Sequence, residues 1–128
     1  MSISAHLDGL RSAVPGCSLV AFGDLDARLV LRASSARPRP QEQLDELCTQ
    51  AASLLSNTAG ETVMQRVFGE TGEIPTEAVV LTPDDVRIYV RSAGEQADVL
   101  CCLCDSAMDA EGAIAAARRV LKKISDGQ

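Results

Sequence analysis

Six consecutive apolar residues, Val99–Cys104, constrain the fold of this chain more than any other segment. Side chains of a strand point alternately to opposite faces of its sheet, so a strand that is apolar at every position must be covered on both faces. The run is also far shorter than the ~18 residues that a membrane-spanning helix needs. We therefore expect a soluble domain in which Val99–Cys104 belongs to a central strand between two layers.

Short apolar or alternating segments, bounded by Gly, Pro and Asp, indicate the strands of this sheet. Turn residues at 24–27, 83–85 and 93–96 separate neighbouring strands and predict hairpins. The predicted strands are, in chain order, Cys17–Phe22, Arg28–Ala33, Ala78–Leu81, Val86–Val90 and Ala97–Cys104.

Apolar residues that recur every three or four positions predict a helix at the start, in the middle and at the end of the chain. The first follows Ser2, a favourable N-cap residue, and stops before Pro15. The second follows Pro40, and Ser106 with Asp109 approximates a capping box before the third. The apolar stripes are Ile3, Leu7, Leu10 and Val14; Leu44, Leu47, Cys48, Ala51, Leu54 and Leu55; and Ile114, Ala117, Leu121 and Ile124.

The segment between the second helix and the third strand, residues 57–76, is longer than most loops of compact domains. Within it Val63, Met64, Val67 and Phe68 are spaced for one face of two helical turns. This short helix could pack on the chain's own core, or it could dock on a partner, since Met and Phe suit adaptable grooves.

The order of elements resembles that of the roadblock family, whose members include dynein light chains and bacterial small-GTPase partners. The resemblance rests on Val14–Gly16 leading into the strand Ser18–Phe22, on the acidic turn Asp24–Asp26, and on a second strand at Leu29–Leu31. It covers nearly the whole chain, from about residue 3 to residue 124.

The resemblance implies an α+β, profilin-like fold of order α-β-β-α-β-β-β-α. Its five-stranded antiparallel sheet would carry the middle helix on one face and the first and last helices on the other. Residues 1–128 would form a single roadblock-like domain, with 57–76 as an insertion relative to the family. Family members usually have Asp-Gly at the first hairpin, where this chain has Asp26 and Ala27.

The resemblance also implies a homodimer, in which third strands join edge to edge and middle helices lie side by side. An apolar edge strand without Lys or interior Pro is an aggregation hazard when unpaired, which supports the same region on physical grounds. The implied dimer interface is Leu44, Leu47, Cys48, Ala51, Leu54, Leu55, Ala78, Val79, Val80 and Leu81.

Negative charge is concentrated between Gln41 and Asp85, where Arg66 is the single basic residue among nine acids. A localised field of this kind steers encounters with a basic partner, although acidic residues also serve as ordinary solvated surface. The acids are Glu42, Asp45, Glu46, Glu61, Glu70, Glu73, Glu77, Asp84 and Asp85. The predicted partner surface is Glu42, Asp45 and Glu46 together with Val63, Met64, Val67 and Phe68.

Other features argue against catalysis and nucleic-acid binding. The net charge of −6 repels phosphates, and aromatic residues are nearly absent, so no base-stacking platform is visible. A local basic cluster, Arg28, Arg32, Arg37 and Arg39, is the exception. The sequence lacks phosphate-binding loops and nucleophile elbows, and its single histidine, His6, is expected on the surface. We expect no enzyme activity, cofactor, metal or membrane association.

The five cysteines cannot all pair within one chain, and the absence of an export signal favours reduced thiols in the cytoplasm. Cys101 points opposite to Cys102 and Cys104 on a strand, so at most two of these converge. Their spacing is not that of zinc ligands. Cys48, on the middle helix, could approach the same residue of a second copy; otherwise it is buried as a small apolar group, as are Cys101, Cys102 and Cys104.

The function that fits these observations best is a non-enzymatic, homodimeric interaction module that scaffolds or regulates a small GTPase or a signalling complex. A small-molecule-sensing domain with a pocket between helix and sheet is the alternative. An enzyme that uses the cysteines is disfavoured because no base is placed beside them.

Overall fold

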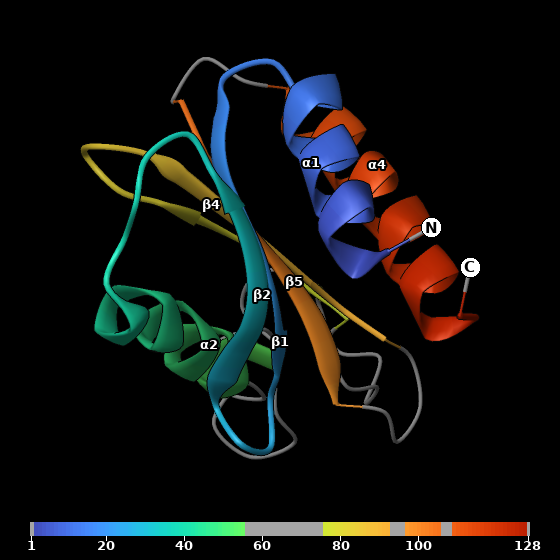
Figure 1. Cartoon of the computed structure of the whole chain (residues 1–128). Helices are drawn as coiled ribbons and strands as arrows, with labels where there is room; N and C mark the ends of the chain where they lie inside the picture. Colours follow the sequence, from blue (N-terminus) through green and yellow to red (C-terminus); the bar gives the residue numbers. More distant parts are fainter. Residues whose placement is uncertain (1, 56–75, 93–96, 106–108, 128) are drawn as a thin grey trace, which may run out of the picture.

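One antiparallel sheet of five strands separates a single helix from a pair of helices (Figure 1). The computed structural model describes residues 2–55, 76–92, 97–105 and 109–127. Its elements are α1 (Ile3–Ala13), β1 (Cys17–Asp24), β2 (Leu29–Ser35), α2 (Gln41–Leu55), β3 (Glu77–Leu81), β4 (Val86–Arg91), β5 (Asp98–Cys104) and α4 (Ala110–Ser125). The strand order is β2-β1-β5-β4-β3, with α2 on one face and α1 beside α4 on the other. The predicted fold class is thereby confirmed.

The apolar run in β5 is covered on both faces, as its sequence requires. Val99, Cys101 and Leu103 lie in the core beneath α2, whereas Leu100, Cys102 and Cys104 lie in the core beneath α1 and α4. Every one of these side chains is at most 6% exposed. β5 is therefore the central strand that the sequence predicts.

The ends of the helices follow local sequence only in part. Ser2 caps α1, since its side-chain oxygen accepts a hydrogen bond from the backbone N–H of Ala5 at 3.1 Å. Asp109 occupies the N-cap of α4 without a side-chain capping bond, and Ser106 lies outside the described residues. The expected capping box is therefore not the way in which α4 begins.

The hairpin between β1 and β2 turns without a glycine. The Asp24 carboxylate accepts hydrogen bonds from the N–H groups of Asp26 and Ala27, at 2.8 and 3.0 Å. The positive φ that the turn needs, 57°, falls on Arg28, one residue after Ala27. Strand β2 consequently starts at Leu29, one residue later than predicted, and continues to Ser35.

Two expectations about single segments change with the structure. His6 is 9% exposed and buried in α1, so its expected surface position is wrong. The short helix expected around Val63 to Phe68 lies outside the described residues. Within the described ranges, no helix is both long and apolar enough to cross a bilayer.

Candidate protein-interaction surface

Strand β3 lies at one edge of the sheet and pairs with β4 along its whole length, Glu77 with Val90 through Leu81 with Val86. In the part of the chain that the structure describes, no strand pairs with its outer side. At one end of β3 the N–H of Arg91 donates to the carbonyl of Thr76, and at the other the N–H of Thr82 donates to the carbonyl of Asp85, both at 2.9 Å. Thr76 and Thr82 therefore belong to hydrogen-bonded pairs of the ladder.

These end positions determine which β3 groups face outward. Hydrogen-bonded and non-hydrogen-bonded pairs alternate along an antiparallel ladder. Counting from Thr76 and Thr82, the N–H and C=O groups of Glu77, Val79 and Leu81 point away from β4. The outer edge of β3 therefore offers a regular row of backbone donors and acceptors.

The side chains of β3 are divided between the two faces of the sheet. Ala78 and Val80 pack into the core beneath α2. Val79 and Leu81 point to the opposite face and are 37% and 77% exposed. Glu77, on that same face, forms an ion pair with Arg118 of α4. β3 thus combines unpaired backbone with exposed apolar side chains.

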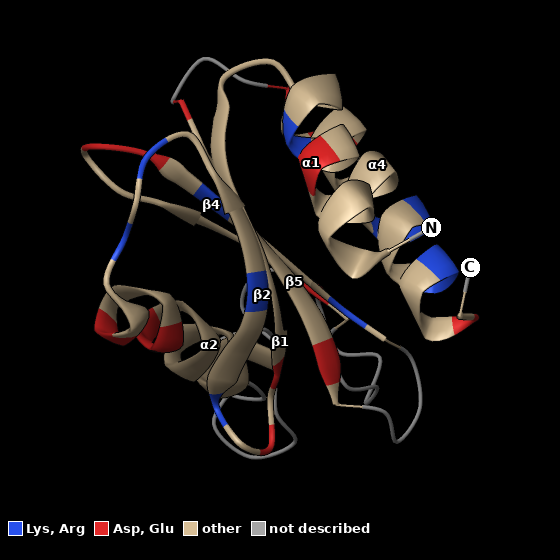
Figure 2. Ribbon diagram, in the orientation of Figure 1, with Lys and Arg blue, Asp and Glu red and all other residues tan. Residues whose placement is uncertain are grey.

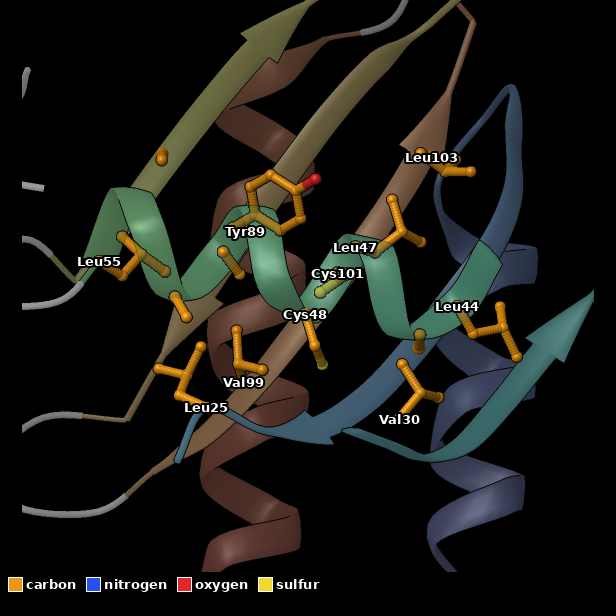
Figure 3. Close-up of a cluster of buried hydrophobic side chains, with 14 of the residues drawn as sticks. Leu25, Val30, Leu44, Leu47, Cys48, Leu55, Tyr89, Val99, Cys101 and Leu103 are labelled. Atoms are coloured by element: carbon orange, nitrogen blue, oxygen red, sulfur yellow. The ribbon is translucent and has the colours of Figure 1, made fainter. Parts of the chain in front are cut away.

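The apolar stripe of α2 is used within the chain itself. Leu44, Leu47, Cys48, Ala51 and Leu55 are all at most 9% exposed and belong to the core that α2 forms with the sheet. Figure 3 shows Leu47 and Cys48 of the helix near Cys101 of the sheet, and Leu44 near Val30. Leu54 is partly buried.

The apolar stripe of α2 is therefore buried against the chain's own sheet, and its contact with a second copy stays a prediction. The buried positions hold α2 on its own sheet, and pairing of two α2 helices would involve the opposite, outward face. Cys48 is 0% exposed and lies beside Cys101, so the idea that it meets the same residue of a second copy is wrong.

The acidic residues expected to meet a partner fall into two groups. Glu42 and Glu46 are exposed, and Figure 2 shows acidic residues along the first half of α2. Asp45 instead binds its own chain: its carboxylate accepts hydrogen bonds from the N–H of Val30 at 3.0 Å and from the Gln41 side chain at 2.9 Å. The apolar part of this predicted surface, Val63, Met64, Val67 and Phe68, lies outside the described residues.

A polar network that the sequence does not signal anchors β4 to α2. The Gln50 side-chain oxygen accepts hydrogen bonds from Tyr89 Oη and, at 3.3 Å, from Arg87. Arg87 also pairs with Asp85 at 3.2 Å; although burial opposes it, this carboxylate raises the Arg87 pKa. Burial raises the pKa of Tyr89. The network fixes the strand that carries β3.

A cavity of about 210 Å³ lies between α2 and the sheet. Its lining includes leucines and two charged residues of each sign, Arg39 and Arg87, Glu46 and Asp85. Pockets for drug-sized ligands hold about 300–1,000 Å³. The cavity is therefore small for the alternative function, a sensor that binds a small molecule between helix and sheet.

The side chains that commonly bind metal ions are scattered in the described ranges. His, Cys, Asp and Glu side chains do not gather there in groups of three or more that could hold a metal ion. The cluster Arg28, Arg32, Arg37 and Arg39 lies on the β1–β2 hairpin and on the connection from β2 to α2. Arg32 belongs to β2, the edge of the sheet opposite β3, whereas Arg39 lines the cavity that Asp85 and Arg87 also line.

No protein-family model and no curated protein matches the sequence, but solved structures share its fold. The Roadblock/LC7 domain from Streptomyces avermitilis has a TM-score of 0.74 at 19% identity, covering 98% of this chain and 97% of that one. The structure described as MglB with tetrameric arrangement has a TM-score of 0.71 at 21% sequence identity, covering 97% of this chain and 85% of that one. The gliding protein MglB from Thermus thermophilus has a TM-score of 0.70 at 20% sequence identity, covering 97% of this chain and 86% of that one.

Proposed function

Since the chain has the roadblock fold, we propose that it is a non-enzymatic homodimeric interaction module of the cytoplasm that scaffolds or regulates a small GTPase or a signalling complex. The observation that carries this proposal is the outer edge of β3, whose backbone groups are regular and unpaired within the described chain. Such an edge is a template for a further strand.

A second copy of the chain supplies a matching strand. Two β3 edges related by a two-fold axis pair antiparallel, and the outward groups of Glu77, Val79 and Leu81 then form hydrogen bonds in both directions. Pairing also removes part of the exposed Val79 and Leu81 side chains from water. The dimer should bury on the order of 1,200–2,000 Å² in total.

In the dimer, both copies of α2 lie on the same face of one continuous sheet. This is the face to which the Ala78 and Val80 side chains of β3 point, since they pack in the core that α2 covers. The exposed carboxylates of Glu42 and Glu46 are thereby doubled on one surface. A surface of this charge favours a partner with a basic face and speeds its association at low salt. The roadblock resemblance, which includes bacterial small-GTPase partners, supports a GTPase in this role.

The dimer is tested by the mass of the particle at micromolar concentration, measured by sedimentation or light scattering. We expect twice the chain mass of 13.5 kDa for the wild type and the chain mass for Val79→Pro. Proline at Val79 removes an outward N–H while leaving the β3–β4 ladder intact.

Ala33→Pro is the matched control, because Ala33 is an exposed position of the other edge strand whose N–H also points outward. The N–H of Ala36 donates to the carbonyl of Ser18 at 2.9 Å, and hydrogen-bonded and non-hydrogen-bonded pairs alternate from there, so the N–H of Ala33 points away from β1. This variant should remain a dimer. A monomeric wild type, or a Val79→Pro variant that stays dimeric, would contradict the proposed dimer.

The partner is tested by pull-down with purified small GTPases loaded with GDP or a GTP analogue. Glu42→Lys with Glu46→Lys should weaken capture at low salt, whereas Glu111→Lys on α4, an exposed acid of the opposite face, should not. Capture that is equal for both variants would exclude the α2 surface. No capture of any GTPase by the dimeric wild type would exclude a GTPase partner and leave the dimer standing.

A further inference from the structure

Three cysteines gather on the α1–α4 side of the sheet, at the end where β1 begins and β5 finishes. Cys17 opens β1, and Cys102 and Cys104 lie near the end of β5. All three belong to the same core cluster, in which Cys17 is only partly buried. Cys17 stands directly opposite Cys104 in the register between the two strands.

The pairing of β1 with β5 brings Cys17 close to Cys104. The N–H of Asp105 donates to the carbonyl of Gly16 at 3.0 Å, which holds the start of β1 against the end of β5, and the register between the two strands shifts between Cys17 and Leu19. At this position the Cys17 sulfur lies within hydrogen-bonding reach of the Cys102 and Cys104 thiols. Directly opposed residues of antiparallel strands have Cα atoms about 4.5–5.5 Å apart, and disulfides need about 4.4–6.8 Å, so we take the register partner Cys104 as the thiol that pairs with Cys17.

Access from solvent distinguishes Cys17 from its neighbours. Cys102 and Cys104 are 1% and 2% exposed, whereas Cys17 is partly exposed. The residues next to the pair, Gly16 and Asp105, line an open cavity of about 660 Å³ between the end of α1 and the start of α4. A small oxidant can therefore approach the pair from this side.

Solvent access favours Cys17 as the thiol that ionises, because a thiolate on Cys102 or Cys104 would be buried. Hydrogen bonds from the Cys102 and Cys104 thiols lower the Cys17 pKa; burial opposes them, and the charge of Arg11 lowers the pKa further. The same interactions raise the pKa values of Cys102 and Cys104. A thiolate that is partly exposed and lies beside a second thiol has the properties of a redox-sensitive cysteine.

We propose that Cys17 is a peroxide-sensitive modification site and that Cys104 is its resolving thiol, so that hydrogen peroxide converts the pair into a reversible cross-strand disulfide. The site is separate from the β3 edge, because β1 and β5 are interior strands of the sheet. The proposal therefore stands whether or not the chain dimerises.

The reaction has two steps. The Cys17 thiolate attacks one peroxide oxygen, an S–O bond forms as the O–O bond breaks, and the released hydroxide takes a proton to become water. The Cys104 sulfur then attacks the Cys17 sulfenic acid, an S–S bond forms as the S–O bond breaks, and the leaving hydroxide takes the Cys104 proton. Two thiols are oxidised to one disulfide, and one peroxide is reduced to two waters.

The chain contains its own control in a second pair of thiols on the other face of β5. Cys48 and Cys101 also adjoin each other, and their interaction lowers the Cys48 pKa, but they are 0% and 1% exposed beneath α2. If proximity of thiols alone decided oxidation, both pairs would react. If access decides it, as we propose, only the pair with Cys17 reacts.

The experiment treats the full chain with stoichiometric hydrogen peroxide and maps the products by peptide mass spectrometry without reduction. We expect a Cys17–Cys104 disulfide that dithiothreitol reverses, with Cys48 and Cys101 left as free thiols. Cys104→Ser should stop at the Cys17 sulfenic acid, which dimedone traps, and Cys48→Ser should behave as the wild type. Oxidation of Cys48 as fast as Cys17, or a Cys17–Cys102 bond, would overturn the assignment.

Alkylation of the untreated wild type gives a measurement that needs no variant. At neutral pH iodoacetamide should modify Cys17 on the order of tenfold faster than Cys48. Equal rates at the two positions would show that Cys17 is not the accessible thiolate of the chain and would overturn the proposal.

Discussion

The two edges of the sheet, β2 and β3, both expose large apolar side chains, yet they differ in regularity. Leu29 and Leu31 on β2 are 46% and 51% exposed, and Val79 and Leu81 on β3 are 37% and 77% exposed. Exposed apolar surface alone therefore does not distinguish them. The difference lies in the backbone that each edge presents to another strand.

Strand β2 carries a bulge, and β3 does not. In the register with β1, Phe22 pairs with Arg32 and Gly23 with Val30, so Leu31 is an extra residue. A bulge interrupts the row of donors and acceptors and twists the edge, and the charge of the neighbouring Arg32 further discourages pairing. β3 keeps an unbroken register from Glu77 to Leu81. One edge is protected against pairing and the other is suited to it.

The largest expected effect is a difference in unfolding free energy between proline substitutions on the β4-facing side and on the outward side of β3. Val80→Pro removes a ladder bond to β4 and places the proline ring in the core, so it should lower the free energy of unfolding by about 3 kcal/mol. Val79→Pro changes only the outward side and should cost the monomer less than about 1 kcal/mol. Urea denaturation of both variants, compared at concentrations where both are monomeric, measures the difference. Equal losses would show that the outward side is not free.

Substitution of the exposed leucines compares the two edges directly. Leu81→Asp puts a second carboxylate on an edge that already carries Glu77, so like charges of two copies approach each other when the edges pair. We expect the dimer dissociation constant to rise about tenfold, equivalent to about 1.4 kcal/mol. Leu31→Asp, on the bulge of β2, should leave the constant unchanged. Sedimentation over a dilution series gives both values, and the reverse order would contradict the assignment of the edges.

The side-chain tethers of the two edges should differ in strength. Asp45→Ala leaves the buried N–H of Val30 without its side-chain acceptor and should destabilise the chain by about 1–2 kcal/mol. Arg118→Ala breaks an exposed ion pair with Glu77 and should cost less than about 0.5 kcal/mol. Thermal or urea unfolding measures both changes. A larger loss for Arg118→Ala would mean that β3 depends on α4 more than its exposure indicates.

The smallest expected effect is a change in how stability depends on pH, caused by Tyr89 of β4, the strand that pairs with β3. The Tyr89 pKa is raised by burial above the ordinary value of 10.0, so the folded state retains the phenol proton after the unfolded state loses it. The stability that Tyr89 contributes is complete below pH 10 and declines as the pH rises above it. In Tyr89→Phe this part of the decline should be absent. Urea unfolding between pH 9 and 11 tests this, and identical slopes for the two proteins would contradict it.

Much of the fold follows from local sequence because periodicity reports which faces of an element are apolar. Val99–Cys104 is apolar on both faces and becomes the central strand, and the breakers around Pro15 and Pro40 mark the ends of elements. Periodicity does not report which neighbour covers an apolar face. For this reason the sequence alone leaves the leucines of α2 open to a dimer interface, although they pack on the chain's own sheet.

Features that depend on strand register could not be predicted in the same way. The extra residue Leu31 lies in a segment that reads as a regular alternating strand, so its bulge has no local signal. The network of Gln50, Arg87 and Tyr89 joins residues far apart in the sequence. The third thiol near Cys102 and Cys104 comes from β1 and is placed there only by the pairing of β1 with β5.

The most direct test of the account is hydrogen exchange at the outward N–H groups of both edges in one sample, resolved by residue with NMR. At high protein concentration the amides of Val79 and Leu81 should be protected, and dilution below the dimer dissociation constant should remove that protection. The outward amides of Ala33 and Ser35 on β2 should exchange fast at every concentration. Fast, concentration-independent exchange at Val79 and Leu81, or concentration-dependent protection on β2, would contradict pairing through β3.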